Sequence, residues 1–179
     1  MKQLRESDLH EAPLLFQAAS SSCLQCLTRV SDEILNTLGQ GELRQQLLAK
    51  DLKGKTIIFH AACSENVEVF QAVLTMIAAE KGERPGNESW LTQVSSSDIG
   101  GYTNIDGKRI VIDVEEKTVL HHACQTGSMA IVSEVNKEAK SHGNGFLKRF
   151  LYRSDYLGRT AVMHVFRSCL LYTSDAADE

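Results

Sequence analysis

The sequence lacks any apolar run long enough to cross a membrane. Its longest, from Val73 to Ala79, is interrupted by Thr75, whereas a membrane-spanning helix needs about 20 consecutive apolar residues. The first eight residues, MKQLRESD, are charged and lack the apolar centre of a secretory signal. These absences predict a soluble, cytoplasmic protein with no membrane contact within this segment.

A basic excess is also lacking. The chain has 19 Lys and Arg against 23 Asp and Glu, which gives a net charge of −4 at pH 7. Nucleic-acid-binding domains usually carry a basic excess or a basic stripe, so we expect no nucleic-acid partner. Five scattered cysteines are more typical of small buried residues in a reducing compartment than of a disulfide framework.

No motif for catalysis, metal binding or cofactor binding is complete. There is no Gly-x-Ser-x-Gly sequence. Gly54-Lys55-Thr56 resembles the end of a phosphate loop, but Ala49 stands where that loop needs glycine, and the preceding residues are typical of a helix. Cys23-x-x-Cys26 has neither a second pair for zinc nor the βαβ context of a redox pair. We therefore expect no enzyme, cofactor or metal site, and we expect Cys26 to pack in the core.

The most informative stretch runs from Asp113 to Val135, DVEEKTVLHHACQTGSMAIVSEV. Thr118 can cap a following helix, on which Leu120 and Cys124 share one face. Gly127 supplies a turn that needs positive φ, and the helical apolar period then restarts. The pattern predicts a short helix, a turn and a second helix, whose apolar faces need neighbours on both sides.

The centre of this stretch, TVLHHAC followed by Gly127 and an apolar pair, resembles the ankyrin repeat. That family's unit carries T-P-L-H-x-A-A/C, a short helix, a glycine turn and a second helix; here Val119 replaces the proline. The resemblance implies an all-α solenoid of helix-turn-helix units. It also implies that His121 stabilises neighbouring turns through backbone groups and that His122 faces the concave surface.

The sequence contains an internal repeat. Leu-x-x-x-Leu-x-x-x-Asp-x-x-Gly-x-Thr occurs twice, 104 residues apart. In the first of these copies, Glu65 stands where the ankyrin family usually has glycine. Four copies of the unit are predicted to start at Asp8, Asp51, Asp113 and Asp155.

The spacings between these copies are 43, 62 and 42 residues, against an ankyrin period of about 33. The surplus predicts a longer or an added helix, from Ser31 to Leu38 and from Glu42 to Lys50 around a break at Gly39. The longest spacing contains an insertion at about 81–112. Asp106-Gly107 between β-branched segments predicts a β-hairpin that projects from the array, and we expect residues 82–100 to be looser than the hairpin.

The predicted domain covers residues 1–168. Cys169 to Glu179, CLLYTSDAADE, is similar to a translated sequencing adapter and is interpreted as an artefact; an ordinary acidic tail is the alternative. On the first interpretation the chain is a fragment, with further repeats or domains missing at its C-terminus. Leu157, Val162 and Val165 would then have an uncovered side.

Function follows from the resemblance. It implies a scaffold or adaptor that binds an unidentified protein through a rigid concave surface and performs no chemistry. A second hypothesis is the cytosolic ankyrin region of a larger membrane protein, such as a cation channel of the transient-receptor-potential kind, whose arrays also have irregular lengths and projecting fingers.

In ankyrin arrays, partners contact the turn tips and the exposed side of the first helices. Tyr156 and Arg159 are the expected anchors, because binding hot spots are enriched in Tyr and Arg; the alternative is ordinary solvated surface. Histidines at one repeat position could also suggest a metal ladder or a pH sensor, although a polar interaction surface is the commoner interpretation. The predicted partner-binding residues are Leu52, Lys53, Lys55, His60, Ser64, Glu115, Lys117, His122, Gln125, Tyr156, Arg159 and His164.

Overall fold

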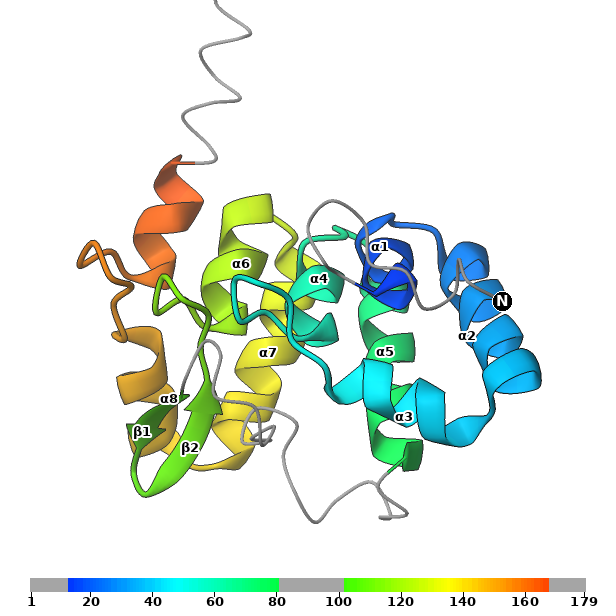
Figure 1. The fold of residues 1–179 in the computed structure, drawn as a ribbon. Helices are drawn as coiled ribbons and strands as arrows, with labels where there is room; N and C mark the ends of the chain where they lie inside the picture. The colour runs from blue at the N-terminus through cyan, green and yellow to red at the C-terminus, as the bar shows by residue number, and fades with distance from the viewer. Residues whose placement is uncertain (1–12, 81–101, 168–179) are drawn as a thin grey trace, which may run out of the picture.

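The computed structural model describes residues 13–80 and 102–167. This part of the chain is mostly helical, as expected for the all-α class (Figure 1). None of its helices is long and apolar enough to cross a membrane. The elements are α1 (Leu14–Ser20), α2 (Leu24–Leu38), α3 (Gln40–Leu48), α4 (Ile57–Ala62), α5 (Val67–Glu80), β1 (Tyr102–Ile105), β2 (Lys108–Val111), α6 (Val119–Thr126), α7 (Met129–Ser141) and α8 (Asn144–Leu151), followed by a helical stretch at 161–167.

Six of the described helices form three pairs of a short and a longer helix, and α3 and α8 follow the first and third pairs. The short helices α1, α4 and α6 are each followed by a longer one, α2, α5 and α7 respectively. Helix α4 packs against both α1 and α6, and each short helix packs against its long follower. Figure 1 shows these pairs in chain order across the view, from α1 and α2 on the right to the 161–167 stretch on the left. The chain therefore advances in one direction, unit by unit.

Small residues let the short helices approach one another closely. Ala61 and Ala62 on α4 and Ala123 on α6 are fully buried, as is Leu120 apart from 1% of its surface. Because these side chains are short, the neighbouring helices can pack closely where they lie. Larger apolar residues fill the remaining space between the units. The core is made by residues such as Leu15, Phe16, Ile57, Phe59, Phe70, Val73, Leu120, Ile131, Val135 and Phe150.

Residues with positive φ end several of these helices. Gly127 closes α6 with φ 75°, which confirms its predicted place. Glu65 has φ 61° in the corresponding turn after α4, so a non-glycine residue carries the left-handed conformation there. Gly39, with φ 86°, separates α2 from α3. The predicted break at Gly39 is confirmed. Residues 31–38 extend α2, as predicted for a longer second helix, and α3 is the added helix, two residues earlier at each end than the predicted Glu42 to Lys50.

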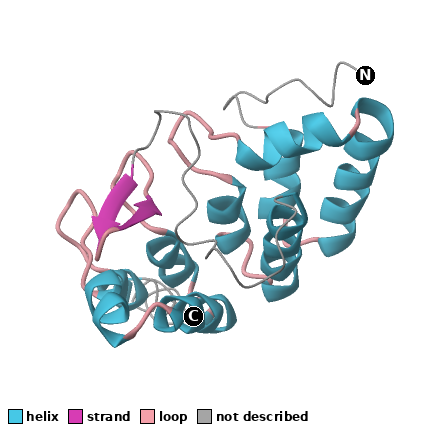
Figure 2. Cartoon of the chain, turned by 90° about the horizontal axis from the view of Figure 1, so that it is seen from below, coloured by secondary structure: helices cyan, strands magenta, loops and turns pink. Residues whose placement is uncertain are grey.

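The predicted β-hairpin is present. Its register places Ile105 opposite Lys108, and Asp106 and Gly107 between them have φ 55° and 78°. Two positive φ values in a two-residue loop are typical of a type I′ turn. Figure 2 shows the hairpin as the magenta arrows beside the helices.

The hairpin does not project from the array, so that part of the prediction is wrong. Ile105 and Ile110 are buried in the core, and β1 packs against α8. Asp106 forms an ion pair with Arg149 of α8. Side chains alternate between the two faces of each strand, so the hairpin has one apolar face. Burial of that face keeps the hairpin packed against the helices.

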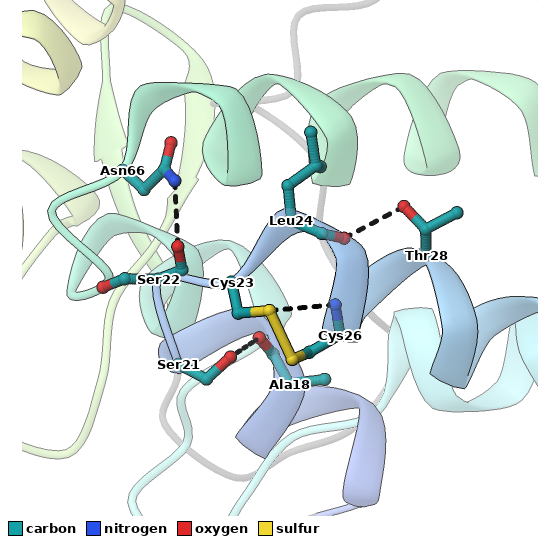
Figure 3. Close-up of a disulfide and its surroundings, with 8 residues drawn as sticks. All are labelled: Ala18, Ser21, Ser22, Cys23, Leu24, Cys26, Thr28 and Asn66. Carbon is teal, nitrogen blue, oxygen red and sulfur yellow. Dashed lines mark hydrogen bonds between the residues drawn. A yellow bond between two sulfur atoms is a disulfide. The ribbon is translucent and has the colours of Figure 1, made fainter.

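Cys23 and Cys26 form a disulfide (Figure 3), which corrects the expectation that Cys26 packs in the core. The two residues are the N-cap and third position of α2, with Cα atoms 5.2 Å apart, a separation that suits a disulfide. Cys26 is exposed, whereas Leu27 takes the buried position. The Cys26 N–H donates a hydrogen bond to Cys23 Sγ at 3.1 Å.

Three predictions fall on parts of the chain outside the described residues. They are the start of the first copy at Asp8, the looser segment at 82–100, and the adapter-like sequence at 169–179.

Candidate interaction surface at three stacked turns

Three turns of the chain share one hydrogen-bonding pattern, and each begins with an aspartate. Asp51 Oδ1 accepts hydrogen bonds from the N–H groups of Lys53 and Lys55, both at 2.8 Å. An aspartate is suited to this position because its carboxylate can accept from backbone N–H groups within its own turn. The equivalent bonds run to Asp113 from Glu115 and Lys117, both 2.9 Å, and to Asp155 from Leu157 at 3.0 Å and Arg159 at 2.9 Å.

The fourth residue of each turn has a left-handed backbone. Gly54 and Gly158 occupy this position in two turns, with φ 72° and 75°. In the middle turn the residue is Glu116, with φ 56°. This conformation costs a non-glycine residue free energy, so the middle turn keeps the shared shape against its local preference.

Hydrogen bonds connect the three turns to one another. The Val114 N–H donates to the Lys53 carbonyl, and the Tyr156 N–H donates to the Glu115 carbonyl, each at 2.9 Å. Both bonds join the same two turn positions. The turns therefore lie side by side in regular order, even though their aspartates are 62 and 42 residues apart in the sequence.

Each turn aspartate also holds a histidine from its own short helical segment. Nε2 of His60, His122 and His164 lies 3.0, 2.9 and 3.0 Å from Oδ2 of Asp51, Asp113 and Asp155 respectively. His122 and His164 are only 3% and 4% exposed, so the expectation that His122 faces an open concave surface is wrong. Each imidazole points at its own turn because the turn aspartate accepts a charge-assisted hydrogen bond, which is stronger than a bond to a neutral acceptor.

Burial and hydrogen bonding set the charges in the middle turn. Burial alone would raise the pKa of Asp113, but hydrogen bonds from His122 and from the Lys117 and Glu115 N–H groups hold it below its usual range. Burial lowers the pKa of His122, against the effect of Asp113. A neutral imidazole beside a carboxylate carries its proton on Nε2, so His122 donates to Asp113 and leaves Nδ1 as an acceptor.

Cys63 completes a chain of contacts with this pair. Its Sγ lies 3.7 Å from His122 Nδ1, so the thiol can donate to the imidazole. Burial raises the pKa of the Cys63 thiol, which keeps it protonated at neutral pH. The order of groups matches a Cys-His-Asp triad, but the thiolate that such chemistry requires is disfavoured.

Ring contacts carry the stacking across the unit boundaries. Each anchored histidine packs against a ring of the preceding unit: Phe16 with His60, Phe59 with His122, and His121 with His164, with centroids 5.0, 5.3 and 5.6 Å apart. The three pairs occupy equivalent positions, so one buried contact repeats along the stack.

His121 stands where the second unit has Phe59 and differs from it by bonding to its own turn. Its Nδ1 accepts a hydrogen bond from the Thr118 N–H at 3.1 Å. Burial and the nearby His164 lower the pKa of His121 to about 4, against the opposing effect of the Asp155 charge. His121 is therefore neutral in the fold. Its backbone bond lies within its own turn, whereas the resemblance implied bonds to neighbouring turns, and its Nε2 has no hydrogen-bond partner among the described residues.

A cavity of about 410 Å³ lies between the Asp51 turn and the Asp113 turn. It brings together half of the predicted partner-binding residues, and its walls also include three that the sequence interpretation missed: Cys63, Glu65 and Thr126. These residues lie at or just after the C-terminal ends of α4 and α6. The signal in the sequence for these helix ends is the pair of turn positions Glu65 and Gly127, which have positive φ. The predicted residues that line the cavity are Lys53, Lys55, Glu115, Lys117, His122 and Gln125.

The remaining predicted residues divide into exposed and enclosed ones. Leu52 and Tyr156 are exposed at the turn tips, whereas Ser64 and His164 are buried. His60 is half-buried on Asp51, and Arg159 is held by Asp155 through its own side chain, with Nε at 3.0 Å. The Ser64 hydroxyl donates to the Ala61 carbonyl at the end of α4 at 2.7 Å, so it is used within the fold and is not available to a partner.

An apolar row runs along the turn tips. Leu52, Val114 and Tyr156 each follow the aspartate of their turn, and they are 59%, 55% and 74% exposed. The hydrogen bonds between the turns place them in register. Val114 was not predicted, but its place directly after Asp113 matches that of Leu52 after Asp51.

No family model matches this chain, and no curated protein matches its sequence. Over residues 13–80 and 102–167, no group of three or more His, Cys, Asp or Glu side chains is arranged to hold a metal ion.

Proposed function

We propose that the chain is an irregular ankyrin-type array that binds a protein partner across the three turns and the cavity between them, and that it performs no chemistry of its own. The observation that carries the proposal is the apolar row of Leu52, Val114 and Tyr156 on turns that are hydrogen-bonded to each other. Exposed apolar side chains in a fixed row are unusual unless they contact something.

The arrangement is favourable for binding because little has to be ordered. Asp113 fixes its turn through three hydrogen bonds, and the neighbouring turns have the same supports. A surface that is already rigid loses little conformational entropy when a partner binds. Tyr156 is the expected hot spot, since Tyr is enriched at the centres of interfaces.

A cytoplasmic location is part of the proposal, and the cysteines give it mixed support. Cys63 and Cys124 are free thiols, as a reducing compartment requires. The Cys23–Cys26 disulfide is of a kind that in the cytosol is usually transient.

Site-specific photo-cross-linking tests the function. A photoreactive amino acid is placed at Leu52, Val114 or Tyr156, and as a control at Leu35, which is exposed on α2. In extract from cells that express the protein, we expect the three turn positions to capture one common protein that Leu35 does not. Equal capture from Leu35, or capture from none of the turns, would contradict the proposal.

Histidine substitutions do not serve this test. His122 and His164 hold their turns through Asp113 and Asp155, so replacing them would disturb the fold and the surface together. The pair Leu52→Ser and Tyr156→Ser removes exposed groups only. We expect it to abolish the cross-link from Val114 while the far-ultraviolet circular dichroism stays unchanged.

A further inference from the structure

We propose that the partner segment is an extended acidic peptide: its carboxylates bind at the lysines of the cavity, and its apolar residues, every third in sequence, lie on Leu52, Val114 and Tyr156. This inference rests on the proposed function and specifies the chemistry of the partner.

The free positive charges of the cavity belong to Lys53 and Lys55. Neither ammonium group makes an ion pair with a carboxylate of the described residues. Lys117, by contrast, pairs with Glu115, and the hydrogen bond from Lys117 lowers the pKa of Glu115. Two unpaired lysines beside a pocket are available to a carboxylate from outside, and charge-assisted bonds of this kind are among the stronger polar contacts.

Lysine charges act on the titratable groups of the cavity wall. Among nearby charges, Lys55 has the largest effect on the pKa of the Cys63 thiol, which it lowers against the dominant effect of burial. Lys55 also has a larger through-space charge effect on His122 than Asp113 has. At Glu115, a carboxylate already in the cavity wall, the through-space charge effect of Lys117 is the largest, and the opposing effect of Asp113 exceeds that of Lys55. An incoming carboxylate therefore meets favourable lysine charges together with the unfavourable charge of Asp113.

The spacing of the turns indicates the conformation of the peptide. Each turn contributes two neighbouring backbone segments. In the Asp51 turn, the Asp51 N–H donates to the Lys55 carbonyl at 2.9 Å and so joins the two segments. Two such segments at about 4.8 Å each separate equivalent positions by roughly 10 Å, which agrees with packed helix axes about 8–10 Å apart. In a polyproline II chain, every third residue returns to one side after about 9 Å. Leucines at every third position therefore match the row.

A nucleic acid fits this surface less well than a peptide. Glu65 and Glu115 also line the cavity, and in the Asp155 turn Arg159 is paired with Asp155. A continuous phosphate backbone needs a longer basic track than two lysines provide. A peptide can place carboxylates at the lysines and apolar side chains along the row.

Fluorescence anisotropy with a defined probe tests the inference on the full chain. The probe is a short labelled peptide with leucine at every third position and glutamate between. Its comparisons are a peptide with glutamine for glutamate, a scrambled peptide of the same composition, and an oligothymidylate. The protein variants are Lys53→Glu/Lys55→Glu and, as a control with the same change of net charge, Lys137→Glu/Lys140→Glu on the exposed side of α7.

We expect the glutamate peptide to bind wild type at least about tenfold more tightly than the glutamine or the scrambled peptide. The Lys53→Glu/Lys55→Glu variant should lose this binding and the control should keep it. Binding should weaken with added salt, since the lysines are partly exposed. The bound peptide should also slow alkylation of Cys63, which lies in the cavity wall, as followed by mass spectrometry of that residue.

Four outcomes would overturn the inference: equal binding of the glutamate and glutamine peptides, equal binding of the scrambled peptide, equal loss in both protein variants, or tighter binding of the oligothymidylate. Unchanged alkylation of Cys63 would contradict the cavity as the carboxylate site. If the turn positions still cross-link to one common protein, the proposed function stands and only the acidic chemistry of the partner fails. If the turn positions do not cross-link to a common protein, the proposed function and the inference about the acidic peptide are both contradicted.

Discussion

Replacing Asp113 by alanine tests the central support of the middle turn. The Asp113 carboxylate accepts hydrogen bonds at 2.9 Å from the Glu115 N–H, the Lys117 N–H and His122 Nε2. Lys117 and His122 are buried, so water cannot easily replace the lost acceptor for them. Glu115 is exposed and can bond to water instead.

The expected cost follows from these three bonds. A buried donor left without an acceptor costs about 1–3 kcal/mol, and two such donors remain. Removing one partner of a buried pair typically costs about 3–5 kcal/mol. Relief from burying the Asp113 charge offsets part of the loss, so we expect Asp113→Ala to lower the free energy of unfolding by about 3 kcal/mol.

Asp51→Ala is the matched control. It removes the same three bonds from the preceding turn, but the His60 side chain is 20% exposed, whereas the His122 side chain is 4% exposed. Water can satisfy His60 in part, so we expect a loss of about 1–2 kcal/mol. Urea titrations followed by far-ultraviolet circular dichroism measure both values.

The comparison has a clear adverse result. A loss for Asp113→Ala that is within error of zero, or smaller than the loss for Asp51→Ala, would refute the reasoning from burial. A double-mutant cycle with His122→Phe adds a direct measure of the pair. We expect a coupling energy of about 1–3 kcal/mol between Asp113 and His122; none would mean that the short contact contributes nothing.

Three further predictions concern backbone strain, pH and packing. Glu116→Gly should raise the free energy of unfolding by about 1 kcal/mol, because the residue has positive φ, whereas Gly158→Ala should lower it; a destabilised Glu116→Gly in the same titrations would contradict this. His121 has a pKa lowered to about 4 from 6.5, so its unfolded form binds a proton that the folded form excludes, and stability should fall as pH decreases from 6.5 towards 4. His121→Phe, which copies Phe59, should flatten that slope in thermal melts taken across this range, and an unchanged slope would exclude His121 as its source. Leu120→Ala should cost about 2–5 kcal/mol through the cavity it leaves between units, and a urea midpoint equal to that of wild type would show that Leu120 does not carry the packing.

Local features were accessible from the sequence because they depend on neighbouring residues alone. Asp106-Gly107 predicted a two-residue hairpin turn, since both positions tolerate positive φ. Gly39 and Gly127 predicted helix ends for the same reason. The repeated Asp-x-x-Gly-x-Thr pattern located Asp51 and Asp155 as equivalent, and spacing to the next helix located Asp113 between them.

The candidate surface was only partly accessible. Sequence reasoning placed Lys53, Lys55 and Tyr156 on the turns, where they are found. It also placed His122 on the concave surface, because the resemblance to the ankyrin repeat implies that position. Nothing in the local pattern shows that Asp113, nine residues earlier, captures that imidazole.

Contacts between units needed the tertiary structure. The bond from the Val114 N–H to the Lys53 carbonyl joins residues on either side of the insertion, and only packing of α4 against α6 brings them together. The docking of β1, with Ile105, against α8 likewise depends on a helix that follows it by more than 30 residues. Sequence therefore determined the turns, the helix ends and the repeat, which follow from short-range backbone preferences. Tertiary structure alone decided the stacking, the cavity and the apolar row. Each of them forms only when segments far apart in the sequence come together, and the entropy cost of closing those loops is offset by packing that local patterns do not show.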